Sequence, residues 1–405
     1  MRRYALEGLK VCDFSWVGVG PVSTKYLADN GADVIRIESA THPDVLRMAP
    51  PWKDGVPGVN RSQFFASYNT SKRSLALDLS RPQAREIALK LVGWADVVVE
   101  SFTPRVLRRY GLDYESLRKF KPDLVMLSTC LQGQTGPRAE FPGFGQLMSG
   151  LSGFYYISGY SEDSPCPPYG AYTDFVATRF VAISLLAALA NRQRTGRGQY
   201  IDVSQYEASL HNLAPAIIDY FATGRVLKAQ ANRSGRYAPH GAYRCADESG
   251  HERWIALAVA NDAQWQGLMK VLGVSEGEPR FATMSGRLEA ADELDRFIGA
   301  LTRGWHTEDL VAALQSHGVP AYQVQSCTDL HADPNLEAFG FWYWLDHKEM
   351  GPSPYEGLQH RLSRTPGELK SPAPLLGEHT DDVLRGVLGL SPDEIEELKR
   401  EQVLL

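Results

Sequence analysis

The sequence lacks the features of several protein classes. Only 5 of its 405 residues are cysteine, and no two of them form a Cys-x-x-Cys pair. Its 10 histidines show no His-x-x-x-His spacing, which would place two imidazoles on one helix face for a metal. The formal net charge is −6, without the basic surplus of a duplex-binding protein. We therefore expect no disulfide framework, no metal site and no nucleic-acid partner.

Long apolar runs are also missing. No uninterrupted apolar stretch reaches the length needed to span a bilayer, and the first residues are too polar for a secretory signal. We therefore expect a cytoplasmic protein with no membrane partner. A hydrophobic content of 43% and a charged content of 22% are typical of a soluble globular protein.

The first half of the chain alternates short β-branched runs with helical patterns. Strands are expected at 9–14, 33–38, 96–100 and 124–128, and helices at 21–30 and 82–94. Strands that are apolar on both faces and separated by helices indicate a parallel sheet covered on two sides. The fold class is therefore α/β, with a Rossmann-like large domain and a smaller α+β domain.

The expected domain boundaries follow from changes in pattern along the chain. Residues 1–205 and 376–405 are assigned to the large domain and 230–325 to the small one. A linker is expected at 206–229, which opens with a helical run to about residue 222, and a return linker is expected at 326–375. Residues from about 224 to 242 are polar and rich in Gly, Arg and Asn, as in a linker or an active-site loop.

One motif imitates a nicotinamide site. Gly18 and Gly20 follow the first strand and open a helix, and Glu38 ends the second strand. The third glycine of the fingerprint is Ser23, and Pro21 removes a backbone donor where phosphate would bind. A tight strand-to-helix turn is favoured, and a nicotinamide oxidoreductase stays open as an alternative.

Asp174 stands alone before a strongly apolar run at 175–190, which predicts a buried helix. Free backbone N–H groups and the helix dipole favour an ionised carboxylate at this end of a helix. Such a carboxylate can act as a nucleophile, and it can equally be a helix cap, because Asp is a preferred capping residue.

Taken together, several segments resemble the class III CoA-transferases, the family of formyl-CoA transferase, carnitine CoA-transferase and α-methylacyl-CoA racemase. The resemblance is carried by Asp174 and by residues 6–14, 27–38, 71–79, 95–102, 133–137, 195–199 and 373–380, which occur in family order. It implies a dimer of two interlocked chains, either a homodimer or a heterodimer with a paralogue.

The resemblance also implies that Asp174 is the catalytic nucleophile, which forms a mixed anhydride and then a thioester with coenzyme A. No cofactor is implied, because the CoA thioesters are the substrates. The positions that match CoA-binding residues of the family, or that add positive charge near them, are Arg109, Phe102, Ser101, Val17, Gly18, Leu77, Lys72 and Arg73. For Leu77 core packing is an equally good account, and for Arg109 a helix-end cation is the alternative.

Departures from the family pattern bear on the reaction. The histidine and aspartate that the racemase branch uses are replaced by Phe144 and Gly145, and phenylalanine cannot exchange a proton. Transfer is therefore favoured, while an acyl-CoA racemase or isomerase and a non-catalytic CoA-binding partner subunit stay open. Succinyl-CoA is a plausible donor, and an aryl- or alkyl-substituted succinate an acceptor to test. The substrate-contact candidates are His240, Arg236 and Tyr172.

Overall fold

A six-stranded parallel sheet organises the first of two compact units in the computed structural model, which describes residues 3–161, 163–275 and 278–405. The strand order is β3-β2-β1-β4-β5-β8, and every neighbouring pair is parallel. The strands are β1 (Lys10–Asp13), β2 (Asp33–Glu38), β3 (Arg73–Ala76), β4 (Val97–Glu100), β5 (Val125–Cys130) and β8 (Gln199–Ser204). The predicted α/β class with a Rossmann-like sheet is confirmed.

Alternate residues of the strands enter two separate cores. Val11, Val99 and Leu127 belong to the core that α1 (Val19–Asp29) and α8 (Tyr172–Thr195) cover. Cys12 and Met126 face the opposite core, which contains side chains of α3 (Pro82–Trp94) and α5 (Tyr114–Phe120). Because successive strand side chains point to opposite faces, a sheet with helices on both sides needs apolar residues at every position.

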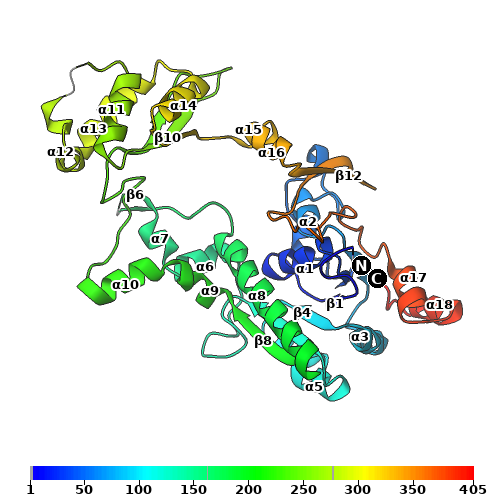
Figure 1. Ribbon diagram of the computed structural model, residues 1–405. Coiled ribbons are helices and arrows are strands. Elements are labelled where there is room, and N and C mark those ends of the chain that lie inside the picture. Colours follow the sequence, from blue (N-terminus) through cyan, green and yellow to red (C-terminus); the bar gives the residue numbers. More distant parts are fainter. Residues whose placement is uncertain (1–2, 162, 276–277) are drawn as a thin grey trace. The chain divides into compact units, whose positions relative to one another are not determined.

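The C-terminal part of the chain also belongs to this unit. In Figure 1 the red α17 (Thr380–Asp382) and α18 (Pro392–Arg400) lie beside α3, and Val383, Leu384 and Ile395 join the same core as the helix. The remaining elements of the unit are η1 (Val45–Met48), η2 (Lys53–Gly55), α2 (Gln63–Ser67), α4 (Arg105–Arg109), α6 (Gly145–Leu151), α9 (Gln205–Asn212), α10 (Ala214–Thr223), β12 (Trp342–His347), β13 (Gly351–Glu356) and the π-helical η4 (Val383–Val387).

The second unit comprises residues 155–166 and 227–334. Its centre is the antiparallel sheet β11-β10-β9, with β9 (His240–Arg244), β10 (Trp254–Ala258) and β11 (Ala321–Gln323). Its other elements are β6 (Gly159–Ser161), β7 (Ser164–Pro165), α11 (Asp262–Val271), η3 (Pro279–Phe281), α12 (Met284–Glu289), α13 (Ala291–Thr302), α14 (Thr307–Ser316) and α15 (Cys327–His331). Two short helices, α7 (Phe154–Ile157) and α16 (Pro334–Ala338), lie where the chain passes from one unit to the other.

The segments expected as linkers contain regular structure, including the helical run expected after residue 205. The stretch 206–229 is largely α9 and α10, and α9 packs against α8 of the first unit. The stretch 326–375 holds two short helices and the β12–β13 hairpin, whose Tyr355 is buried with Phe65 of α2. Residues 155–166, expected in the large domain, group with the second unit. In α9 and in the β12–β13 hairpin, apolar side chains such as Ala208 and Tyr355 are buried against neighbouring elements.

Candidate active site

Asp174 is the third residue of α8, within the first turn of the helix and not at its cap. Ala171 occupies the cap position, no side chain caps the helix, and the Asp174 N–H donates to the Ala171 carbonyl at 2.9 Å. Thr173 ties this first turn to α6 through a 2.9 Å hydrogen bond from its Oγ1 to the Gly145 carbonyl. The capping alternative is therefore wrong, and the carboxylate is left for another role.

Two glycines press against the Asp174 carboxylate from opposite sides. A Cβ built on Gly18 would lie 2.4 Å from Oδ2, and one built on Gly145 would lie 2.4 Å from Oδ1. Neither position accepts a side chain without displacing the carboxylate, so the backbone approaches both oxygens directly. Gly18 is also the cap residue of α1, so the start of a second helix lies beside the carboxylate.

The carboxylate is buried, and no cation in the described part of the chain acts on it. Asp174 is only 8% exposed, and its Oδ1 has no hydrogen-bond partner among the described residues. The pKa of Asp174 is raised to about 7. Burial is the cause, and it outweighs the hydrogen bond from the Gln205 side chain, which acts to lower the pKa. A carboxylate whose pKa lies near neutrality, held beside a helix start, is a typical reactive group.

Gln205 was missed by sequence reasoning. It is the first residue of α9, it is buried, and its Oε1 also has no hydrogen-bond partner among the described residues. Gln205 directly follows β8 and lies 31 positions from Asp174 in the sequence. Only the packing of α9 against α8 brings the two residues together. No local sequence signal marks it.

The turn after β1 connects Asp174 to a cavity at the carboxyl ends of the strands. Trp16 lines this cavity of about 330 Å³, whereas Gly18, two residues on, lies against the Asp174 carboxylate. Other walls come from the ends of β2, β3 and β4, including Glu38, Leu77 and Phe102. Since β1 and β4 are the central strands from which the sheet runs in opposite directions, the cavity occupies the usual ligand position of such folds.

The structure brings several predicted CoA-binding residues to this cavity. Phe102 and Leu77 line it, and the Phe102 ring meets Trp16 edge to face at 5.4 Å. Ser101 fixes the Trp16 backbone, because its Oγ accepts from the Trp16 N–H at 2.8 Å and donates to the Trp16 carbonyl at 3.0 Å. Val17 and Gly18 form the turn itself.

The cationic candidates lie in different places. Arg109 is exposed at the end of α4, whose Val106 and Leu107 line the cavity. Lys72 is not on the surface: its side chain is fully buried and pairs with Asp13 at 3.2 Å. Arg73 binds both oxygens of Asp33, at 3.0 and 2.6 Å. These pairings occupy Lys72 and Arg73, so the structure does not bring either of them to the cavity.

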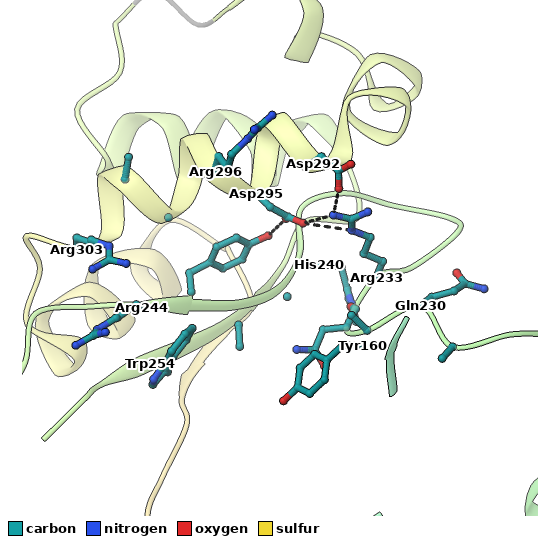
Figure 2. A pocket seen from close by; sticks show the side chains of 18 residues that line it. Tyr160, Gln230, Arg233, His240, Arg244, Trp254, Asp292, Asp295, Arg296 and Arg303 are labelled. Carbon is teal, nitrogen blue, oxygen red and sulfur yellow. Dashed lines mark hydrogen bonds and ion pairs between the residues drawn. The ribbon is translucent and has the colours of Figure 1, made fainter. Parts of the chain in front are cut away.

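The substrate candidates divide between the two units. Tyr172 starts α8, two residues before Asp174, and its ring meets Phe154 edge to face at 5.2 Å. His240 and Arg236 belong to the second unit. His240 lines a cavity of about 1150 Å³ there, and Figure 2 shows it beside Arg233, which is paired with Asp292 and Asp295. Arg236 is exposed and does not line this cavity.

Two features of the described part of the chain bear on metal binding and on membranes. No cluster of three or more His, Cys, Asp or Glu side chains suited to a metal ion occurs among the described residues. One helix, α8, is long and apolar enough to cross a membrane by length and composition, a property that core helices of globular proteins share. In this structure α8 packs on β5 and β8.

Comparisons with known proteins agree with this arrangement. The chain is 33% identical over 387 residues, 95% of its length and 96% of the relative's, to a succinate–glutarate CoA-transferase of Agrobacterium fabrum. It is 30% identical over 402 residues to a succinyl-CoA–D-citramalate CoA-transferase of Chloroflexus aurantiacus, with 98% of each chain covered. A crystal structure of a CAIB/BAIF family protein from Brucella suis superposes with a TM-score of 0.87 at 32% identity, covering 96% of this chain and all of that one. The model of CoA-transferase family III matches residues 6–380, and the chain belongs to this family of enzymes.

Proposed function

We propose that this CoA-transferase moves coenzyme A from succinyl-CoA to another carboxylic acid through covalent intermediates on Asp174. The observation that carries the proposal is the state of that side chain. It is a buried carboxylate without a cation, has an unpartnered oxygen, and lies against two glycines. An anion held this way has little solvation to lose when it attacks a carbonyl carbon.

The reaction begins when an Asp174 oxygen attacks the thioester carbonyl of succinyl-CoA. The C–S bond breaks, CoA thiolate leaves, and a succinyl-aspartyl anhydride remains. The thiolate then attacks the aspartyl carbonyl and releases succinate, which leaves Asp174 as a CoA thioester. An acceptor carboxylate attacks this thioester and expels the thiolate, which finally attacks the acceptor's acyl carbon. The Asp174 carboxylate is regenerated, and no proton is gained or lost.

Each tetrahedral intermediate places negative charge on a carbonyl oxygen, which needs a donor. The start of α1, after Gly18, offers backbone N–H groups beside Asp174. The Gln205 side-chain amide offers a further donor, in keeping with its effect on the Asp174 pKa. The absence of side chains on Gly18 and Gly145 leaves room for the approach of a thioester once the carboxylate rotates.

The choice of donor and acceptor rests on different grounds. A succinyl donor is supported by the two relatives described above, whose names contain succinate or succinyl-CoA. An aryl- or alkyl-substituted succinate as acceptor is supported by exposed aromatic side chains next to the site. Phe144 precedes Gly145, and Tyr172 and Phe175 flank Asp174 on α8.

We also infer a dimer, with identical chains or with a paralogue, acting in the cytoplasm. The support lies in exposed apolar side chains of the first unit on α8 and α10. Ile183 and Leu186 of α8 and Ile218 and Phe221 of α10 are between 48% and 81% exposed. A partner chain that covers them would remove this apolar surface from water.

The test is mass spectrometry of the protein after incubation with succinyl-CoA, with and without hydroxylamine. We expect a CoA adduct, or a hydroxamate after trapping, on the peptide that contains Asp174. In the Asp174→Asn variant, both labelling and transfer to an acceptor acid should vanish. Labelling of another residue, or no labelling in the wild-type protein, would contradict the mechanism.

The same preparation separates the alternatives. Uptake of α-deuterium from deuterated water into an acyl-CoA, without an acceptor acid, would support a racemase or isomerase. The site makes this outcome unexpected, because Phe144 and Gly145 have no side chain that can exchange a proton. Tight CoA binding without labelling would support a non-catalytic partner subunit.

A further inference from the structure

Val17, the residue between the cavity wall and the nucleophile, has an unfavourable backbone. Its φ is 65°, in the left-handed region that β-branched residues avoid. A conformation of this kind is strained and persists only where the surroundings impose it. The question is therefore which contacts hold Val17 in place and what its position achieves.

Asp44 provides the contact on Val17. Its Oδ2 accepts a hydrogen bond from the Val17 N–H at 3.0 Å, and its Oδ1 accepts one from the Leu46 N–H at 2.9 Å. The Asp44 side chain is 0% exposed, so these bonds are not shared with water. The carboxylate thus has one oxygen for the turn and one for the segment that carries it.

Arg36 fixes Asp44 and the same turn together. Its guanidinium pairs with Asp44 Oδ2 at 2.5 Å, and another of its nitrogens donates to the Ser15 carbonyl at 2.8 Å. Arg36 lies on β2 and its side chain is 0% exposed. A rigid strand, a buried cation and a buried carboxylate therefore hold the backbone on both sides of Trp16.

The consequence of this anchoring is the position of Gly18. With Val17 left-handed, Gly18 comes so close to Asp174 that an added Cβ would lie 2.4 Å from Oδ2. A change of Val17 to an ordinary negative φ would rotate the following peptide by roughly 130°. Gly18, and with it the start of α1, would no longer face the carboxylate in the same way.

We propose that Asp44, braced by Arg36, is a positioning residue that holds Val17 in its left-handed conformation and thereby sets Gly18 against the nucleophile Asp174. The proposal rests on the function proposed above. It assigns a role in the reaction to a residue that touches neither the cavity wall nor the carboxylate, and it gives a reason for the strained valine.

The experiment compares Asp44→Asn in two backgrounds, wild type and Val17→Gly. Asparagine keeps the shape of the side chain but cannot accept from both N–H groups or pair with Arg36. In the wild-type background we expect single-turnover acylation of Asp174 by succinyl-CoA to slow by about 10- to 100-fold. Affinity for free CoA, measured by calorimetry, should change by less than about threefold, because Ser101 still holds Trp16.

The Val17→Gly background is the matched control. Glycine adopts the left-handed conformation without an anchor, so there Asp44→Asn should slow acylation by less than about threefold. The melting temperature should fall by a similar amount in both backgrounds, because in each Arg36 loses its ion pair with Asp44 and keeps the one with Glu38. An equal loss of rate in both, or no loss in the wild-type background, would overturn the proposal.

A second pair of variants covers the case in which Asp44→Asn does not fold. Val17→Ala and Val17→Gly both remove the two γ-methyl groups, and only alanine, which keeps its Cβ, keeps the left-handed penalty. The glycine variant should therefore melt at the higher temperature, and equal melting would count against the anchoring of Val17. Absence of acylation in the wild-type protein would instead contradict the proposed function, and the melting comparison would still decide the anchoring.

Discussion

Two groups of buried carboxylates in the first unit have opposite surroundings. Asp13 and Glu38 are buried among cations, and their pKa values are lowered. Burial raises the pKa of Glu38, but Arg36 and Arg47 outweigh it and bring the value to about 2. Burial also raises the pKa of Asp13, and Lys72 and Arg36 outweigh it there. Asp174 is buried to a similar degree with no cation beside it, and its pKa is raised to about 7.

The difference separates scaffold from chemistry. Removing a carboxylate from water is unfavourable, and a cation with good geometry offsets this where the chain needs a fixed shape. Glu38 receives hydrogen bonds from Arg47 at 2.7 and 3.0 Å and is acceptor to a guanidinium on each side. Asp174 keeps the unfavourable free energy of burial, and it keeps an oxygen free to react.

The largest effect is expected when the paired and the unpaired carboxylate are neutralised in turn. Glu38→Gln and Asp174→Asn should change the stability of the protein in opposite directions. Glu38→Gln leaves two buried guanidinium groups short of charge, and we expect a loss of about 3–5 kcal/mol in the free energy of unfolding. Asp174→Asn removes an unpaired buried charge, so it should raise the melting temperature at pH 8. Urea unfolding of both variants and of the wild-type protein at pH 8 shows whether each substitution raises or lowers the free energy of unfolding.

The pH dependence of stability tests whether the buried charge of Asp174 destabilises the folded state. Its folded-state pKa of about 7 lies above the ordinary value of 3.8, so the folded state holds a proton that the unfolded chain releases. The stability that this proton contributes is complete below pH 3.8 and is lost as the pH rises to about 7. The advantage of Asp174→Asn should therefore shrink as the pH is lowered from 8 to 4. An advantage that does not vary with pH would contradict the assignment.

The second largest effect concerns the two glycines. Gly145→Ala adds a methyl group 2.4 Å from Asp174 Oδ1, which the carboxylate can avoid only by moving. We expect acylation by succinyl-CoA to slow by about 100-fold, because a displacement of about 1 Å at a reacting atom has effects of this size. The matched control is Gly386→Ala, also a helical position of the first unit, where an added Cβ meets nothing within 4 Å. Equal rates in the two variants would contradict close contact at Asp174.

Much of the sheet could be predicted from the sequence. The strand at 33–38 and the helix at 82–94 match β2 and α3 residue for residue, because apolar pattern and flanking turns agree there. The strand β3 was not predicted, because Arg73–Ala76 is short and only two of its residues, Leu75 and Ala76, are apolar. Its place in the sheet depends on pairing with β2, which a local pattern does not report.

A residue of the site could be predicted only where its neighbours in the sequence mark it. Asp174 stands out because a lone acid precedes an apolar helix. Gln205 and Asp44 do not stand out, because their roles depend on contacts with residues far away in the sequence. Lys72 was expected to supply charge near CoA and lies buried with Asp13. Sequence reports the type of a charged group, and only packing reports whether a partner already occupies it.

A smaller effect is expected in the pH profile of the reaction. In the proposed mechanism only the ionised form of Asp174 attacks the thioester, so acylation should fall about tenfold per pH unit below about 7. Glu100 is a second buried acid of the first unit whose pKa burial raises to about 7. The profile of Glu100→Gln should keep its midpoint if Asp174 is responsible. A midpoint that moves with this substitution would assign the profile to Glu100.

The smallest effect concerns the wall of the cavity and not the nucleophile. Ser101→Ala removes both hydrogen bonds that hold the Trp16 backbone, and the indole then has more freedom beside Phe102. We expect KM for succinyl-CoA to rise by about three- to tenfold, as for the loss of hydrogen bonds worth about 1 kcal/mol, with kcat nearly unchanged. Ser116→Ala, at a helix start away from the cavity, is the control for a lost serine hydroxyl. A fall in kcat without a change in KM would mean that Trp16 acts on the chemistry at Asp174. The proposed division between a cavity that binds CoA and a carboxylate that reacts with it would then be wrong.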